Sequence, residues 1–184
     1  NLIHCINEVF GYILFFDNVR NIENFKTIDS LKEIIEKIKE STNLKKIWIV
    51  NCNIIDKLET GNAKILTVER CKNIENIIYE KNLEKLSIID CQKIDINNIK
   101  DLDLKILYLE YLKIDNFNTM ENMKKLEELG LLEIDLENET LDKLTNIKKI
   151  VLNGSKVKDQ KEVVKFFKDR GIEIEFYEKN LPIG

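Results

Sequence analysis

Apolar residues recur at fixed offsets along most of the chain. Segments 44–52 (LKKIWIVNC), 63–71 (AKILTVERC) and 83–91 (LEKLSIIDC) share a nine-residue frame with apolar residues at positions one, four and six. Three further copies of the frame occupy residues 104–112, 126–134 and 147–155. Positions four and six lie two residues apart, so on a strand they point to the same face. The pattern therefore predicts six short strands, each with one buried face.

The fourth position of each frame gives the length of the repeat. These anchors lie 19, 20, 21, 22 and 21 residues apart and are Ile47, Leu66, Leu86, Leu107, Leu129 and Ile150. A single strand cannot bury its apolar face alone, but stacked copies build a continuous core and a parallel sheet. So short a repeat leaves little chain for the return path, which predicts extended or 3₁₀ segments more often than full helices.

The six frames resemble the leucine-rich repeat family over about residues 44–176, in an irregular, short-repeat form that carries Cys at the ninth position. The first three copies have Cys52, Cys71 and Cys91 there, and the last three depart from the pattern with Leu112, Ile134 and Ser155. The resemblance implies an α/β leucine-rich-repeat solenoid with a curved parallel β-sheet on its concave side, short helical or 3₁₀ convex segments and helical caps. It also implies that each buried thiol satisfies backbone groups at the turn that follows its strand.

The two ends differ from the repeats, which divides the chain into three regions. Residues 1–43 are expected to form an N-terminal cap, residues 44–158 the repeats, and residues 159–184 a C-terminal cap. In the first region, residues 10–18 fit the frame loosely and predict a divergent first repeat. Ser30 and Glu33 form a capping box that predicts an amphipathic helix to about Glu40.

The C-terminal cap shows a helix followed by a strand. Residues 161–170 place their apolar side chains on one face of a helix, and Gly171 supplies a left-handed stop. Residues 172–176 alternate apolar and charged side chains, which predicts a final edge strand whose glutamates discourage pairing with another sheet.

Composition argues against several kinds of function. The chain of 184 residues has 29 Lys and Arg against 33 Asp and Glu, a formal net charge of −4, so bulk charge does not favour direct nucleic-acid binding. With only six glycines and no GxxxxGK[ST] or GxGxxG motif, a glycine-built phosphate cradle is not expected. His4 is the single histidine and no CxxC pair occurs. We therefore expect no enzyme, no metal site and no cofactor; an enzyme would depend on His4 as its base.

The sequence also bears on the compartment. Its longest apolar run, residues 9–16, falls short of a membrane span and lacks the features of a signal peptide. Four cysteines without paired spacing favour a reduced, intracellular protein, cytoplasmic or nuclear. Secretion is the alternative if an N-terminal signal has been removed.

In the resembling family, the variable positions beside the inner residues face the concave surface. Here those positions carry apolar and aromatic side chains with a charged rim, a composition typical of protein interfaces. The predicted partner-binding residues are Trp48, Val50, Ile65, Arg70, Ile89, Ile106, Tyr108, Tyr111 and Leu132. Trp48, Tyr108 and Tyr111 are the expected anchors of a non-catalytic protein–protein interaction module. The competing explanation is that an Ile-rich composition scatters apolar residues onto exposed strands.

Charge along the repeats leaves two narrower roles open. Lys45, Lys46 and Lys64 give the early repeats a basic edge, whereas the fifth repeat is acidic. Opposite charges could orient a bound protein segment. One alternative is a substrate adaptor or assembly subunit of a larger complex, of the ubiquitin-ligase type. The other is association with a ribonucleoprotein through the Lys-rich early repeats. The partner's identity and the oligomeric state stay open.

Overall fold

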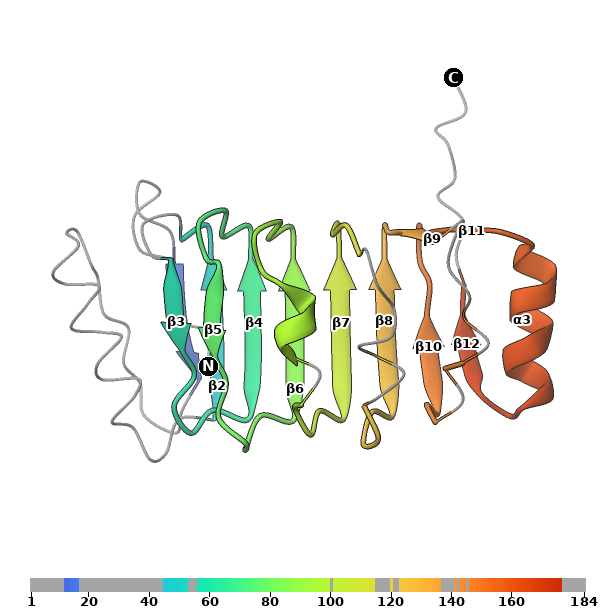
Figure 1. The fold of residues 1–184 in the computed structure, drawn as a ribbon, viewed down its shortest axis with the longest axis horizontal. Helices are drawn as coiled ribbons and strands as arrows, with labels where there is room; N and C mark the ends of the chain where they lie inside the picture. Colours follow the sequence, from blue (N-terminus) through green and yellow to red (C-terminus); the bar gives the residue numbers. More distant parts are fainter. Residues whose placement is uncertain are drawn as a thin grey trace, which may run out of the picture.

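The computed structural model describes residues 12–16, 45–52, 56–99, 101–114, 120, 123–136, 141, 143–144 and 146–176. Within them the fold is α/β, with a mostly parallel eight-stranded sheet and few helices (Figure 1). In spatial order the strands are β1 (Tyr12–Phe16), β2 (Lys46–Val50), β4 (Ile65–Glu69), β6 (Lys85–Ile89), β7 (Ile106–Glu110), β8 (Glu128–Leu132), β10 (Lys149–Val151) and β12 (Glu173–Glu175). The six strands predicted from the frames are β2, β4, β6, β7, β8 and β10, so that prediction is confirmed.

The anchors of neighbouring frames lie side by side in the sheet. Ile47 pairs with Leu66, and the same register continues through Leu86 and Leu107 to Leu129. All of these residues are fully buried. The repeat therefore sets the register, because a slip of one residue would turn every anchor to the opposite face.

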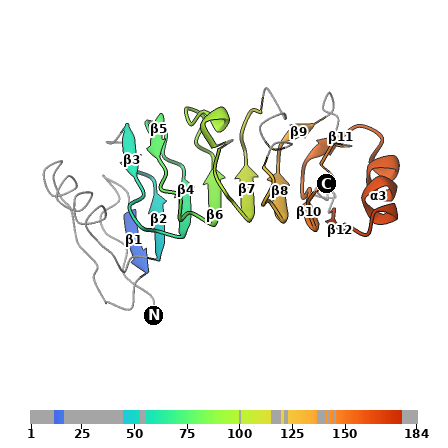
Figure 2. The same ribbon diagram turned by 60° about the horizontal axis from the view of Figure 1, so that its bottom comes forward.

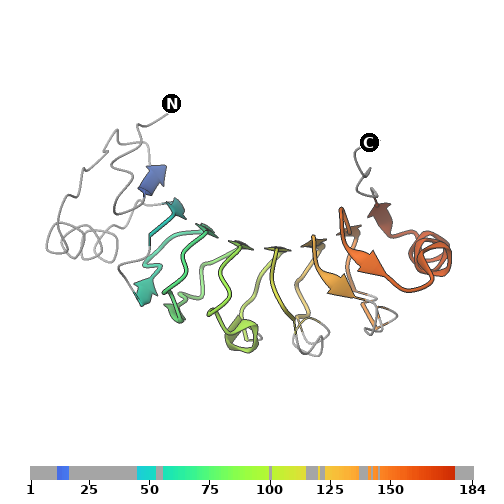
Figure 3. The same ribbon diagram turned by 90° about the horizontal axis from the view of Figure 1, so that it is seen from above.

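The sheet follows a shallow arc when seen edge-on (Figure 3). Its strands line the inner side of the arc, and the chain returns between strands on the outer side (Figures 2 and 3). The fully buried side chains, such as Leu107 and Leu109 of β7, point toward the return segments, and the core lies between the two layers. The alternating residues of each strand consequently form the opposite face, which we call the inner face.

The return segments are short and mostly extended. β3 (Lys57–Glu59) pairs in parallel with β5 (Asn76–Ile78), and β9 (Asp135–Leu136) pairs in parallel with β11 (Lys156–Val157). The return after β6 contains a 3₁₀ helix, η1 (Ile96–Ile99), which buries Ile96 and Ile99. Over the described parts of the outer layer, the prediction of extended or 3₁₀ returns is confirmed.

Each strand of the repeats is followed by a residue in the left-handed region. These residues have φ between 49° and 69° and are Asn51, Arg70, Asp90, Tyr111, Glu133 and Gly154. The backbone N–H of Tyr111 donates to the carbonyl of Leu132 at the end of the next strand, and the N–H groups of Asn51, Arg70 and Asp90 make the equivalent bond. A residue with a Cβ pays about 1 kcal/mol or more for this conformation, which glycine and asparagine adopt more readily. Four successive turns nevertheless have other residues there, namely Arg70, Asp90, Tyr111 and Glu133.

The buried cysteines connect successive turns through their thiols. The N–H of Cys52 donates to the Sγ of Cys71, and the N–H of Cys71 donates to the Sγ of Cys91, both at 3.3 Å. Each thiol also reaches strand carbonyls, as Cys91 Sγ does with Val68 O at 3.7 Å. The hydrogen bond with Cys91, together with burial, raises the pKa of the Cys71 thiol far above its usual range. Cys71 and Cys91 thus act as small buried side chains that satisfy backbone groups, as the resemblance implied.

Ser155 reproduces this bonding in the C-terminal part of the sheet. Its Oγ accepts from the N–H of Ile134 at 2.9 Å and donates to the carbonyl of Leu131 at 2.8 Å. Leu131 precedes Ile134 by three residues, the same offset that separates Val68 from Cys71. The departure from cysteine at this position therefore keeps the hydrogen bonds, whereas Leu112 and Ile134 replace them with apolar contact.

We expect Ser155→Ala to lower the free energy of unfolding by about 1–3 kcal/mol, because a buried N–H and a buried carbonyl would both lose their partner. Ser155→Cys retains a donor and an acceptor, and its loss should be less than half as large. Urea denaturation of the two variants measures the difference. Equal losses would show that the hydrogen bonds of Ser155 contribute little.

The two ends of the sheet agree only in part with the sequence prediction. At the C-terminal end the predicted helix, glycine stop and edge strand are present as α3 (Gln160–Asp169), Gly171 with φ +70° and β12 at the end of the sheet, in parallel with β10. Of the apolar residues expected to face inward, Phe167 is buried, whereas Val163, Val164 and Phe166 are only partly buried. At the N-terminal end, β1 pairs antiparallel with β2. A divergent first repeat would run parallel, so residues 12–16 fold back onto β2 instead. The expected helix to about Glu40 lies outside the described residues.

Candidate protein-binding face

The register of the strands places the side chains of the inner face in three rows. The first row contains Lys46, Ile65, Lys85, Ile106, Glu128 and Lys149, the middle row contains Trp48, Thr67, Ser87, Tyr108, Gly130 and Val151, and the third row contains Val50, Glu69, Ile89, Glu110 and Leu132. Most of these side chains are half-buried rather than fully exposed. The rows bring together all of the predicted binding residues except Arg70 and Tyr111, which lie in the turns directly after β4 and β7.

Tyr108 occupies the centre of the face and spans three strands. Its hydroxyl donates to the carboxylate of Glu128 on β8, and the ammonium of Lys85 on β6 lies 5.2 Å from its ring centroid. Burial, with the hydrogen bond to Glu128, raises the pKa of Tyr108 to about 12. The ring lies over Gly130, where an added Cβ would come within 2.2 Å of the Tyr108 Cδ1. The glycine thus makes room for a tyrosine held in one position.

Gly130→Ala is expected to destabilise the protein by about 1–2 kcal/mol, because the new methyl group overlaps the ring of Tyr108. Adding Tyr108→Ala should remove most of that cost, since the clash then has no partner. A double-mutant cycle by urea denaturation measures this coupling. Additive losses would mean that the ring moves away freely and that its position is not fixed.

Trp48 and Val50 lie at the N-terminal end of the face. Trp48 is half-buried, and its Nε1 is buried with no hydrogen-bond partner among the described residues. The ammonium of Lys46 lies 6.0 Å from its ring centroid. Val50 departs from the prediction, because only 7% of it is exposed. Val50 therefore offers a partner little surface, unlike the partly exposed Ile89 and Leu132 in the same row.

The remaining predicted residues are accessible to different degrees. Ile65, Ile89, Ile106 and Leu132 are each partly exposed on interior strands. Arg70 is exposed but engaged, because its guanidinium lies 2.8 Å from the carboxylate of Glu69. Tyr111 is 45% exposed and is one of two large hydrophobic residues exposed to this extent among those described.

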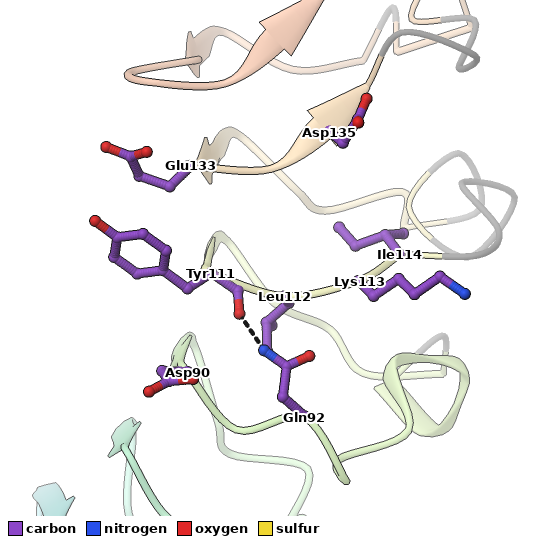
Figure 4. A pocket seen from close by; sticks show the side chains of 8 residues that line it. All are labelled: Asp90, Gln92, Tyr111, Leu112, Lys113, Ile114, Glu133 and Asp135. Atoms are coloured by element: carbon purple, nitrogen blue, oxygen red, sulfur yellow. Dashed lines mark hydrogen bonds between the residues drawn. The ribbon is translucent and has the colours of Figure 1, made fainter. Parts of the chain in front are cut away.

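Tyr111 lines an open depression of about 830 Å³ at the carboxyl ends of the strands. Figure 4 shows its ring pointing the same way as Asp90 and Glu133, with Lys113 and Asp135 on the far side. The side-chain amide of Gln92 donates to the carbonyl of Tyr111, which holds the turn from below. We call the edge of the sheet at this depression the rim. Apart from Tyr111, none of the residues that line the depression was among the predicted binding residues.

Glu110 is the other residue that the prediction missed. It lies in the third row between Ile89 and Leu132, and its carboxylate has no hydrogen-bond or ion-pair partner in the described parts of the chain. Burial, followed by the carboxylates of Glu133 and Glu69, raises the pKa of Glu110 above its usual range. A glutamate at a frame position that is apolar in the neighbouring copies was the available signal.

This raised pKa predicts how stability depends on pH. Because the folded state favours protonated Glu110, the stability it contributes is present below the usual glutamate pKa and is lost as pH rises through the raised value. Glu110→Gln should therefore raise the free energy of unfolding at pH 7 and change it little below about pH 4. Urea denaturation at the two pH values measures this. A destabilised variant at pH 7 would show that the charge of Glu110 supports the fold.

Charges at the opposite edge of the sheet are paired. The carboxylate of Glu84 lies 3.2 Å from Lys64 Nζ and 2.8 Å from Lys105 Nζ, and Glu127 lies 3.0 Å from Lys148 Nζ. Such exposed pairs contribute little to stability, but they neutralise charge locally. Lys64 of the predicted basic edge and Glu127 of the acidic fifth repeat are therefore each partly neutralised by a nearby opposite charge. In the third row of the inner face, Glu69 is paired with Arg70, whereas Glu110 has no ion-pair partner among the described residues.

Comparison with protein-family models, with curated proteins and with solved structures finds no match to this chain. No helix in the described ranges has the length and apolar character needed to cross a membrane. Across the same ranges, no three His, Cys, Asp or Glu side chains are grouped as a metal ion would require. His4 lies outside the described residues. The geometry of the inner face is consequently the basis for a functional proposal.

Proposed function

We propose that this chain is a leucine-rich-repeat solenoid that binds a protein partner through its inner, concave face, without catalysis. The repeat frame, the parallel register of its anchors and the arc of the sheet support the solenoid. The antiparallel direction of β1 does not weigh against the solenoid, because the six frames begin at residue 44.

The observation that carries the binding proposal is the apolar content of a sheet face that nothing in the described chain covers. Ile65, Ile89 and Ile106 are partly exposed on interior strands, where a merely solvated face would favour polar residues. Tyr108 and Trp48 lie in the middle row among them. Aromatic residues surrounded by apolar and charged neighbours dominate the binding energy of protein interfaces.

The fixed position of Tyr108 supports the same proposal. Its ring lies over Gly130, its hydroxyl is bonded to Glu128, and Lys85 lies near its face. A side chain that is already ordered loses less conformational entropy when a partner binds. The face therefore offers a preorganised aromatic contact rather than a flexible one.

An adaptor or assembly subunit is a narrower form of this proposal, and it would use the same face. Association with a ribonucleoprotein through Lys45, Lys46 and Lys64 would instead show a steep loss of binding with salt. The pairing of Lys64 with Glu84 reduces the positive charge available for that contact.

A pull-down from native extract tests the proposal with two matched variants. Tyr108→Glu places a charge at the centre of the inner face, and Asn98→Glu places the same charge on the exposed surface of η1 in the outer layer. We expect Tyr108→Glu to reduce the recovery of specific protein partners at least about tenfold, as the loss of an interface anchor does. Asn98→Glu should retain them. Unchanged recovery with Tyr108→Glu, or equal loss with both variants, would contradict the proposal.

A further inference from the structure

We propose that Glu110, Tyr111, Ile89 and Leu132 form a binding site for a lysine or arginine side chain in a basic segment of the protein partner. The site, called here the Glu110 site, deepens the proposed function and rests on it. It lies where the third row of the inner face meets the rim at the carboxyl ends of β6, β7 and β8.

The first step is the position of the Glu110 carboxylate. In the register of the sheet, Ile89 lies on one side of Glu110 and Leu132 on the other, and all three are partly exposed. A carboxylate between two apolar side chains is partly removed from water, so it gains more from a cation than a fully solvated carboxylate does. No described residue of the chain supplies that cation.

The second step concerns the charges that surround Glu110. Glu69 lies two strands away in the same row, and Glu133 directly follows Leu132, the partner of Glu110 on β8. Both carboxylates disfavour the ionised form of Glu110 and raise its pKa. Arg70 is directed to Glu69, at 2.8 Å, and leaves Glu110 uncompensated. Like charges held together on a folded surface create a negative potential that a cationic partner relieves. The same potential repels phosphates, which argues against a nucleic-acid occupant.

The third step is the exposed aromatic ring of the next residue in the chain. Tyr111 directly follows Glu110, is 45% exposed, and lies between the carboxylates of Asp90 and Glu133 in Figure 4. Its backbone has φ +52°, where glycine or asparagine would cost less. An ammonium or guanidinium group is attracted to the face of an aromatic ring, and neighbouring carboxylates strengthen that attraction.

Together these features match the chemistry of lysine and arginine. Both side chains carry an apolar stem that packs on surfaces such as Ile89 and Leu132, and a charged end that would reach Glu110. A neutral apolar segment would leave the carboxylate buried and unpaired, and an acidic segment would be repelled.

The test uses a peptide of alternating arginine and glycine and its citrulline counterpart, which has the same shape without the charge. Binding to the whole chain is measured by amide chemical-shift changes and by fluorescence anisotropy. The arginine peptide should shift the amides of Ile89, Glu110, Tyr111 and Leu132, and the citrulline peptide should not. Glu110→Gln should weaken binding about tenfold, since a charge-assisted contact is lost. Tyr111→Ala should weaken it about threefold.

Glu127→Gln is the matched control, because it removes one negative charge at the opposite edge, where Glu127 pairs with Lys148. It should change the affinity less than about twofold, as expected for an exposed and distant charge. Equal weakening by Glu110→Gln and Glu127→Gln would overturn the Glu110 site, because attraction would then follow net charge alone. So would equal binding of the citrulline peptide, or tighter binding of an acidic peptide or of single-stranded DNA.

The outcome is separable from that of the proposed function. If Tyr108→Glu abolishes partner recovery while Glu110→Gln leaves both partner recovery and peptide binding intact, the inner face binds a protein but the Glu110 site is wrong. If Glu110→Gln weakens the peptide and Tyr108→Glu leaves partner recovery intact, the proposed function fails. Urea denaturation of Glu110→Gln at pH 7 reports whether this variant stays folded, and so separates loss of binding from unfolding.

Discussion

Leu107→Ala, in the middle of the sheet, is expected to lower the free energy of unfolding by about 2–5 kcal/mol. Leu107 is fully buried between the anchors Leu86 and Leu129, and truncating it removes apolar contact and leaves a cavity. A loss of this size is a large share of the stability of a typical domain, about 5–15 kcal/mol. Urea denaturation followed by circular dichroism measures it.

The neighbouring residue provides the control for this prediction. Ile106 precedes Leu107 on β7 but points to the inner face and is only partly buried. Ile106→Ala should cost less than about 1.5 kcal/mol, because no closed cavity forms and less apolar area is lost. If the two variants lose equal stability, the assignment of core and inner face on β7 is wrong.

Phe167→Ala, at the C-terminal end, is expected to cost about 3–5 kcal/mol. Phe167 is the largest fully buried side chain described and joins α3 to the core beside Ile172. Its loss should expose the end of the sheet at β12, the strand against which α3 packs. Hydrogen exchange of the amides in β10 and β12 should therefore rise before exchange in β6 and β7 does.

Phe166 is the matched position on the same helix. Its ring packs edge-on against Phe167 with centroids 5.1 Å apart, and the guanidinium of Arg170 lies 3.6 Å from its centroid, yet the residue is half-exposed. Phe166→Ala should cost about 1–2 kcal/mol, the value of an aromatic pair and partial burial. A larger loss at Phe166 than at Phe167 would contradict the packing of α3.

Most of the sheet was predictable because one local rule generates it. The apolar residues at frame positions four and six, such as Leu86 and Ile88, fix both which face is buried and which residues pair. The bonds of Cys71 and Cys91 follow from the same spacing, because identical frame positions lie side by side in a parallel sheet.

What the sequence did not predict depends on groups distant in the chain. The antiparallel direction of β1 is set by its pairing with β2, more than 30 residues later, and a loose match to the frame carries no sign of direction. The burial of Val50 likewise departs from its frame position, because Ile89 and Leu132 at the same position are partly exposed. The frame marks Glu110 as a glutamate between apolar copies, but the pairing of Arg70 with Glu69 instead of Glu110 depends on the folded structure.

Two features at the rim of the sheet lower the stability of the fold, namely left-handed backbone conformations and a disfavoured charge. Arg70, Asp90, Tyr111 and Glu133 all adopt positive φ, and Glu110 is held where its charge is disfavoured. Local strain and unfavourable charge concentrate at sites that serve binding or catalysis. Because positive φ recurs after every repeat strand, it follows from the repeat itself, and the unfavourable charge of Glu110 is the feature that agrees with the proposed use of the inner face.

The most direct test of the central claim is site-specific photo-cross-linking from the two layers of the sheet. A benzophenone side chain is placed at Thr67, in the middle row of the inner face, or at Asn98, on the exposed surface of η1. Irradiation in native extract should yield protein adducts from Thr67 that disappear with Tyr108→Glu, and none of these from Asn98. Adducts from Asn98 alone, or from Thr67 regardless of Tyr108→Glu, would contradict binding through the inner face.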